Sequence, residues 1–211
     1  MFQRDYIMRM IEMMGDLMRR ISELLSALAQ MKLLDDESRR HCGLPMEVLE
    51  SLSSESLIDM LAETPRFFAS ELLYIRVTCI PDLAMEDADK LKLKCLRLLA
   101  SLHEEGPLCE LRCDRLMELK NELMPLLTSD DLMTCARFLF QAGEYAHMED
   151  AIFQAIEQAP LELREEQGRY GLHLLELAAT EDAGALAQAR TSSEELVQST
   201  WDLTHVLRSE S

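Results

Sequence analysis

Few residues of this chain have the types and spacing that chemistry requires. Cys109 and Cys113 lie four positions apart on a predicted helix, and His103 stands six residues before Cys109. Two thiols at that spacing share a helix face and can ligate one metal ion, but a closed zinc site needs four ligands. Two packed thiols are the commoner arrangement, because buried cysteine behaves as a small hydrophobic residue. We therefore expect no metal and no cofactor at this pair.

The other reactive residue types are just as dispersed. His41 and Cys42 are neighbours in a polar segment, and adjacency alone does not create the geometry of a nucleophile and its base. Acidic pairs such as Asp130-Asp131 stand at predicted helix starts, where carboxylates interact favourably with the helix dipole. No GxxxxGK(S/T), GxGxxG, HExxH or GxSxG motif is present. No catalytic residue is predicted, and an enzymatic role is left open without support.

The charge of the chain argues against nucleic-acid binding. The 211 residues include 21 Lys and Arg against 39 Asp and Glu, a formal net charge of −18. Residues 1–34 carry a net charge of +1, so the excess of acidic residues lies in the rest of the chain. Such a surface repels phosphate backbones. Six scattered cysteines, no signal peptide and no apolar run long enough to span a membrane favour a location in the reducing cytoplasm.

The composition predicts an all-α fold. Only seven glycines and six prolines interrupt a chain rich in Leu, Ala, Glu and Met, and no segment reads as a strand. Apolar stripes at helical spacing recur between short breaks, which is typical of an antiparallel helical array that resembles an α-solenoid. We expect a long amphipathic N-terminal helix at residues 1–34, a linker at 35–43 and the helical array at 44–211.

The N-terminal helix, predicted over residues 2–34, carries the largest apolar stripe. Its heptad spacing suits a coiled-coil seam or docking on a helical body, so the stripe must pack on its own chain, on a second copy or on another partner. The polar face is mixed rather than basic, which disfavours membrane binding. We predict protein binding, including a homodimer, through six residues of this stripe: Ile7, Met10, Met14, Leu17, Ile21 and Leu24.

The clearest helix pair lies at residues 129–162, where Gly143 marks a tight turn and Pro160 ends the second helix. This stretch resembles a single tetratricopeptide repeat, although Met148 stands where the repeat has alanine. The residues that carry the resemblance are Leu132, Ala136, Leu139, Gly143, Tyr145, Ile152, Ala155 and Pro160.

The resemblance implies that the first helix of this pair lines a concave face that binds a partner. The residues on that face would be Asp130, Met133, Arg137, Phe140 and Gln141. Burial of Met133 and Phe140 against a neighbouring helix is the alternative, because large apolar residues usually belong to the core. Farther along, residues 191–195 provide capping-box chemistry for a last helix whose expected apolar face is Leu196, Trp201 and Val206.

Three longer segments extend the resemblance to most of the chain. They are FQRDYIMRMIEMM at Phe2–Met14, GLPMEVLESLSSESLIDML at Gly43–Leu61 and GEYAHMEDAIF at Gly143–Phe153. The chain is similar in these segments to an uncharacterised bacterial family of all-helical, tetratricopeptide-like proteins. That resemblance implies a fold and brings no known activity.

Two functional hypotheses follow from these patterns. The first is a non-catalytic, cytoplasmic helical scaffold or adaptor that binds a protein, either a second copy of itself or another chain. The alternative is a small-molecule-sensing or catalytic helical domain with a polar pocket between its helices.

Overall fold

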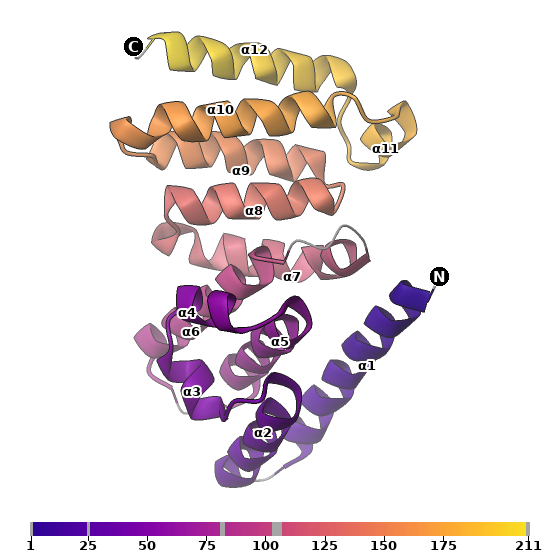
Figure 1. Ribbon diagram of the computed structural model, residues 1–211, viewed down its shortest axis with the longest axis vertical. Helices are drawn as coiled ribbons and strands as arrows, with labels where there is room; N and C mark the ends of the chain where they lie inside the picture. The colour runs from indigo at the N-terminus through magenta and orange to yellow at the C-terminus, as the bar shows by residue number, and fades with distance from the viewer. Residues whose placement is uncertain (1, 25, 81–82, 103–106, 210–211) are drawn as a thin grey trace. The chain divides into compact units, whose positions relative to one another are not determined.

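This computed structural model describes residues 2–24, 26–80, 83–102 and 107–209 (Figure 1). These residues form twelve α-helices and one 3₁₀ turn, joined by loops, and they contain no β-strand. The predicted all-α class is therefore confirmed. The helices form two units. Unit 1 comprises the described residues up to Leu108 together with Arg115–Leu123, and unit 2 comprises Cys109–Asp114 with the described residues from Met124 onward.

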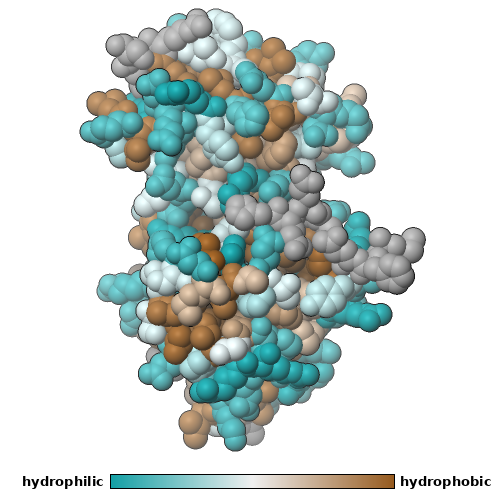
Figure 2. Space-filling view, in the orientation of Figure 1, coloured by the Kyte–Doolittle hydropathy of each residue, from teal (hydrophilic) through white to brown (hydrophobic). Residues whose placement is uncertain are grey.

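Unit 1 is built around α5 (Glu63–Cys79), in which ten of seventeen residues are buried. Burial is so extensive because other helices cover α5 on several sides. These neighbours are α1 (Phe2–Glu23), α2 (Ala27–Cys42), α3 (Met46–Ser51) and α6 (Met85–Ala100). The short helix α4 (Ser54–Met60) packs against α6. Figure 2 shows apolar residues on the surface over α3 and α4. Met60, the last residue of α4, is exposed.

The N-terminal helix predicted over residues 2–34 is two helices, so the predicted length was wrong. The break lies at Ser26, whose side chain accepts a hydrogen bond from the Ala29 N–H at 3.2 Å and so forms the N-cap of α2. The Gln30 side chain donates to the carbonyl oxygens of Ile21 and Leu24. Those carbonyls lie at the end of α1 and just after it, where helical partners run out. The capping serine therefore divides the apolar stripe between two helices.

The segment predicted as a linker, residues 35–43, is the second half of α2 and its C-cap Gly43, and the linker prediction was wrong. Leu34, Ser38 and Cys42 lie at four-residue spacing on the buried face of α2. Ser38 conceals this periodicity in the sequence because it is polar. Its hydroxyl donates to the Leu44 carbonyl oxygen at 2.6 Å, which allows a serine to be buried.

A carboxylate of α2 also fixes the start of α3. The Asp35 side chain accepts the Met46 N–H at 2.8 Å, at the helix start where Pro45 provides no side-chain cap. The same carboxylate accepts a hydrogen bond from the Arg39 guanidinium at 2.8 Å. The Arg39 guanidinium and the Met46 N–H hold the pKa of Asp35 below its usual value. The residues that looked like a linker therefore position the next helix.

A buried guanidinium joins the ends of two helices in unit 1. Arg66 of α5 donates to the carbonyl oxygens of Ile58 and Leu61 at the end of α4. Its other terminal nitrogen donates to the carbonyl and hydroxyl oxygens of Ser101 at the end of α6. The last carbonyls of a helix lack helical partners, and a planar guanidinium with several donors suits them. Arg66 is thus a shared C-terminal cap.

Unit 2 contains a first helix pair, α8 (Ser129–Gln141) and α9 (Tyr145–Gln158), as the sequence predicts. Thr128 and Asp131 form a capping box at the start of α8. Gly143 has φ of 76° and ends the helix in the left-handed conformation that glycine adopts without strain. Met148, the departure from the repeat pattern, is fully buried in this pair.

A second pair, α10 (Leu161–Ala178) and α12 (Ser193–Ser209), packs on the first, and the short helix α11 (Ala183–Gln188) connects its members. Figure 1 shows α8, α9, α10 and α12 side by side in that order. Gln167 of α10 donates to Asp130 of α8 at 2.6 Å, and Ser199 of α12 donates to Glu149 of α9 at 2.7 Å. Each helix of the second pair is therefore bonded to one helix of the first.

Gly171 lets α10 approach α9 closely. A Cβ at this position would lie 2.6 Å from Cγ2 of Ile152 in α9 and 3.5 Å from Cδ2 of Leu203 in α12. The first distance is far below van der Waals contact, so only glycine fits here without a shift of the helices.

Candidate functional site

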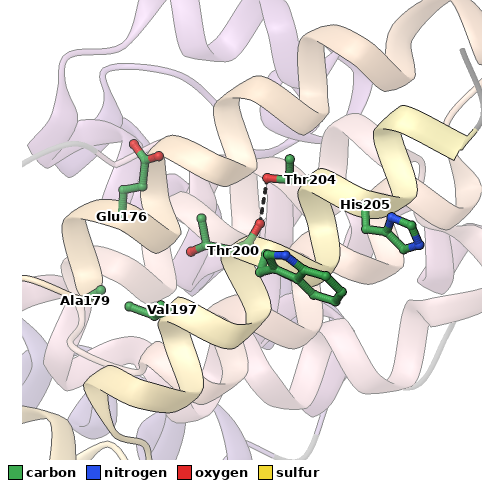
Figure 3. Close-up of a pocket in the computed structure, with 7 residues that line it drawn as sticks. Glu176, Ala179, Val197, Thr200, Thr204 and His205 are labelled. Carbon is green, nitrogen blue, oxygen red and sulfur yellow. Dashed lines mark hydrogen bonds between the residues drawn. The ribbon is translucent and has the colours of Figure 1, made fainter.

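The surface of unit 2 has a groove between α10 and α12. It has a volume of about 580 Å³. Figure 3 shows Ala179, which follows α10 directly, and Val197 of α12 pointing toward one another across it. The residues that line the groove are Glu176, Ala179, Val197, Thr200, Trp201, Thr204 and His205.

The side of α12 that packs into the core is not the side that carries its large residues, so large side chains are left to line the groove. Leu196, Ser199 and Leu203 are buried at spacings of three and four residues. Trp201 lies on another side of the helix and is 62% exposed, and Val206 is 38% exposed. The prediction that these two belong to the core face with Leu196 was wrong.

The walls of the groove are mainly apolar, although two of the lining residues are threonines. The Thr200 hydroxyl donates to the Leu196 carbonyl oxygen at 2.8 Å. The Thr204 hydroxyl donates to the Thr200 carbonyl oxygen, also at 2.8 Å (Figure 3). These hydroxyls are satisfied within α12, so the groove meets mainly their methyl groups. The imidazole of His205 stacks on the indole of Trp201 with ring centroids 5.5 Å apart.

Glu176 supplies the carboxylate of the groove. Its side chain is exposed, and none of the described residues forms a hydrogen bond or an ion pair with it. Two helical turns earlier along α10, the charge of Arg169 is paired with Glu165 at 2.9 Å. The groove thus combines an apolar floor with a negative charge that the described chain leaves uncompensated.

The stripe predicted to bind a partner in the N-terminal helix is buried in unit 1. α1 packs on α5 and α2 of the same chain. Leu24, near the break, is half-buried. The other five side chains are at most 5% exposed, namely Ile7, Met10, Met14, Leu17 and Ile21. These residues are unavailable to a second chain while α1 stays packed, so a homodimer through them requires α1 to leave α5.

The face predicted on α8 is largely occupied by contacts within unit 2. Met133 is 7% exposed, and Arg137 is half-buried. Phe140 is half-buried and lies against Tyr145 with ring centroids 6.0 Å apart. The side-chain oxygen of Gln141 accepts a hydrogen bond from the Cys109 thiol at 3.5 Å. Partner binding by this face stays a prediction.

The residues considered for chemistry are not assembled into a site. Burial raises the pKa of the Cys113 thiol to about 12, so it is a protonated thiol at neutral pH and neither a nucleophile nor a ready ligand. His41 stacks on Phe68 with centroids 4.3 Å apart, and burial raises the pKa of Cys42 to about 12. The described residues contain no group of three side chains able to hold a metal ion. His103 lies outside them.

A second, polar hollow of about 390 Å³ lies between α9 and α12. Its glutamates already accept hydrogen bonds within the chain: Glu149 from the Ser199 hydroxyl, and Glu195 from the Ser192 N–H at 2.9 Å. The latter bond, with the return bond from the Glu195 N–H to the Ser192 hydroxyl, is the capping box predicted for the last helix. The hollow is therefore tied to the packing and capping of α12.

These features define an all-helical protein whose last helix pair carries an apolar groove. The chain belongs to a family of unknown function, DUF6483, whose model matches residues 1–189, so the expected membership in an uncharacterised family is confirmed. Neither a curated protein nor a solved structure matches the chain. Five of the seven groove residues lie beyond residue 189, outside the matched part. Among the described helices, none has the length and apolar character needed to cross a bilayer.

Proposed function

We propose that this chain is a non-catalytic helical adaptor of the cytoplasm, and that it holds a segment of another protein in the groove between α10 and α12. The observation that carries the proposal is the exposure of Trp201 and Val197, at 62% and 57%, on one wall of that groove. Tryptophan is the residue most enriched among those that dominate binding energy at protein interfaces.

Other features support the remaining parts of the proposal. All six cysteines are free thiols and five of them are buried, as suits a protein that stays in a reducing compartment. The thiols of Cys42, Cys95 and Cys113 are held in the protonated state by burial, which favours a structural role over a catalytic one.

The test is capture of proteins from cells that produce this chain, comparing the wild type with two single variants. Val197→Asp places a charge on the groove wall. Leu161→Asp is the matched control, because Leu161 is 72% exposed at the start of α10 and does not line the groove. The proposal expects a set of captured proteins that Val197→Asp loses and Leu161→Asp retains. Identical captured sets for all three proteins would refute it.

Self-association through α1 is a separate proposal that the same preparations test. Size exclusion with light scattering distinguishes the 24.2 kDa monomer from a dimer. A dimer that survives Val197→Asp but is lost on substitution of Met14 by Asp would support pairing through the α1 stripe. A monomer at all concentrations would refute it.

A further inference from the structure

We infer that the segment held by the groove between α10 and α12 is a cationic amphipathic helix, with Lys or Arg beside its apolar side chains. The inference rests on the proposed function and names the partner for the same site. Its starting point is the Glu176 carboxylate, which lines the groove and has no partner among the described residues. A cation from the bound segment is the complement that this carboxylate lacks.

The charge around the groove points the same way. Residues 161–209, which include α10 and α12, carry nine acidic and four basic side chains. Two of the four basic residues are already engaged, Arg169 with Glu165 and Arg164 with the carbonyl oxygen of Ala159. The field at the groove therefore attracts cations and raises their rate of association.

The same charge disfavours the other occupants of an apolar groove. A second copy of the chain would bring another net charge of −18 against this one. An anionic lipid surface would also be repelled, since interfacial binding normally relies on Lys and Arg around the apolar residues. A basic segment of a different protein is the occupant that the electrostatics favour.

The aromatic wall suits a cationic side chain that has an apolar stem. Indole is the best aromatic partner for a cation placed over its face, and Trp201 is largely exposed. Lys and Arg can lay their methylene stems on apolar surface such as Val197 and Ala179 while the charged group reaches Glu176. The carboxylate and the indole of the groove thus suit one long basic side chain, and the apolar floor suits the apolar residues beside it.

The length of the wall suits a helix. Val197, Trp201 and His205 follow one another at four-residue spacing along α12. They span about 12 Å at 1.5 Å per residue. Two turns of a bound helix cover that distance and present anchors at positions i, i+4 and i+7, the usual pattern of a helix lying in a groove.

The test uses three synthetic 16-residue helical peptides with leucines at the anchor positions and Lys, Gln or Glu at the flanking positions. Trp201 is the sole tryptophan of the chain, so its fluorescence reports occupation of the groove directly. We expect the Lys peptide to bind at least tenfold more tightly than the Gln peptide at low salt. High salt should reduce this ratio, because exposed charges are screened.

Two variants of α10 separate recognition at the groove from diffuse attraction. Glu176→Gln should weaken binding of the Lys peptide by about twofold to fivefold, the range of an exposed ion pair, and should leave binding of the Gln peptide unchanged. Glu166→Gln removes the same charge from a residue of α10 that does not line the groove, and it should have no such effect.

Each remaining outcome overturns the inference and bears on the proposed function in its own way. Equal binding of the Lys and Gln peptides would leave groove binding standing but remove the cationic partner. If Glu176→Gln and Glu166→Gln weaken binding of the Lys peptide equally, the preference for Lys comes from the overall negative charge of the chain and not from recognition at the groove. If no peptide changes the emission of Trp201, the cationic helix is excluded, and the capture test on Val197→Asp decides the adaptor function independently. A spectral change only with phosphatidylglycerol vesicles would replace the peptide with a lipid surface.

Discussion

Replacing Gly171 with alanine tests whether the close approach of α10 to α9 sets the packing of unit 2. The substitution adds a methyl group that would lie 2.6 Å from Cγ2 of Ile152. Ile152 is fully buried and β-branched, so its side chain has essentially one rotamer in a helix and cannot rotate away. Overpacking of this kind costs about 1–3 kcal/mol. The gain in helix propensity from glycine to alanine offsets about 0.5–1 kcal/mol of that.

Gly168 provides a matched control on the same helix. A Cβ there would lie 2.5 Å from Cδ2 of Leu207, the far end of a flexible side chain near the end of α12. Leu207 can turn aside at little cost, so Gly168→Ala should keep most of its propensity gain. Both substitutions share that gain, so the difference between their free energies of unfolding isolates the steric term. Gly171→Ala should be less stable than Gly168→Ala by about 1–3 kcal/mol.

The assay is urea unfolding followed by circular dichroism, with native-state hydrogen exchange of α9 and α10 amides to assign the change to unit 2. Ile152→Ala removes the clashing methyl group, so the double variant with Gly171→Ala should show favourable coupling of about 1 kcal/mol or more. If Gly171→Ala is as stable as Gly168→Ala, the glycine is not required by packing and the reasoning fails.

Three further predictions concern single groups. Asp35→Ala should lower the free energy of unfolding by about 1 kcal/mol at neutral pH, because it removes the cap of α3. The pKa of Asp35 is depressed in the folded state, so its contribution is complete above about pH 4 and the difference from the wild type should vanish in acid unfolding curves as the pH falls through that pKa. Arg190 is the one described non-glycine residue with positive φ, at 59°, and Arg190→Gly should raise the free energy of unfolding by about 1 kcal/mol in urea titrations; a loss of stability would contradict this. In the native protein a thiol reagent should label Cys79 first, because the other five thiols are buried, and all six should react in denaturant; rapid labelling of several native thiols would contradict the burial of the rest.

The sequence predicted the helix pair at residues 129–162 well because the residues that end its helices are clear signals. Gly143 adopts positive φ, and α9 stops just before Pro160, as those residue types require. The apolar stripe of the N-terminal segment was also predicted correctly as a surface that must be covered. Its coverage by α5 of the same chain was one of three alternatives, and periodicity alone could not choose among them.

Two of the errors share one physical cause, which is that buried polar residues disguise the core face of a helix. Ser38 is buried in α2 because the carbonyl oxygen of Leu44 accepts its hydroxyl, and Ser199 is buried in α12 because Glu149 accepts its hydroxyl. Neither partner belongs to the helix that carries the serine, so the apolar pattern of that helix does not reveal either bond. Once Ser199 is counted in the core of α12, Trp201 falls on the outside. The Ser26 cap is different, because a serine before an apolar run was a readable signal for a break.

The shared cap at Arg66 has a consequence for how unit 1 unfolds. The guanidinium holds carbonyl oxygens from α4 and α6 at once, so neither helix end can be released without stranding buried donors. The helices α4, α5 and α6 should therefore open as one cooperative unit, with amides of α4 and α6 exchanging at a common rate. A lysine in this position has a single charged nitrogen and cannot span the same carbonyls, so Arg66→Lys should let the two helices fluctuate independently.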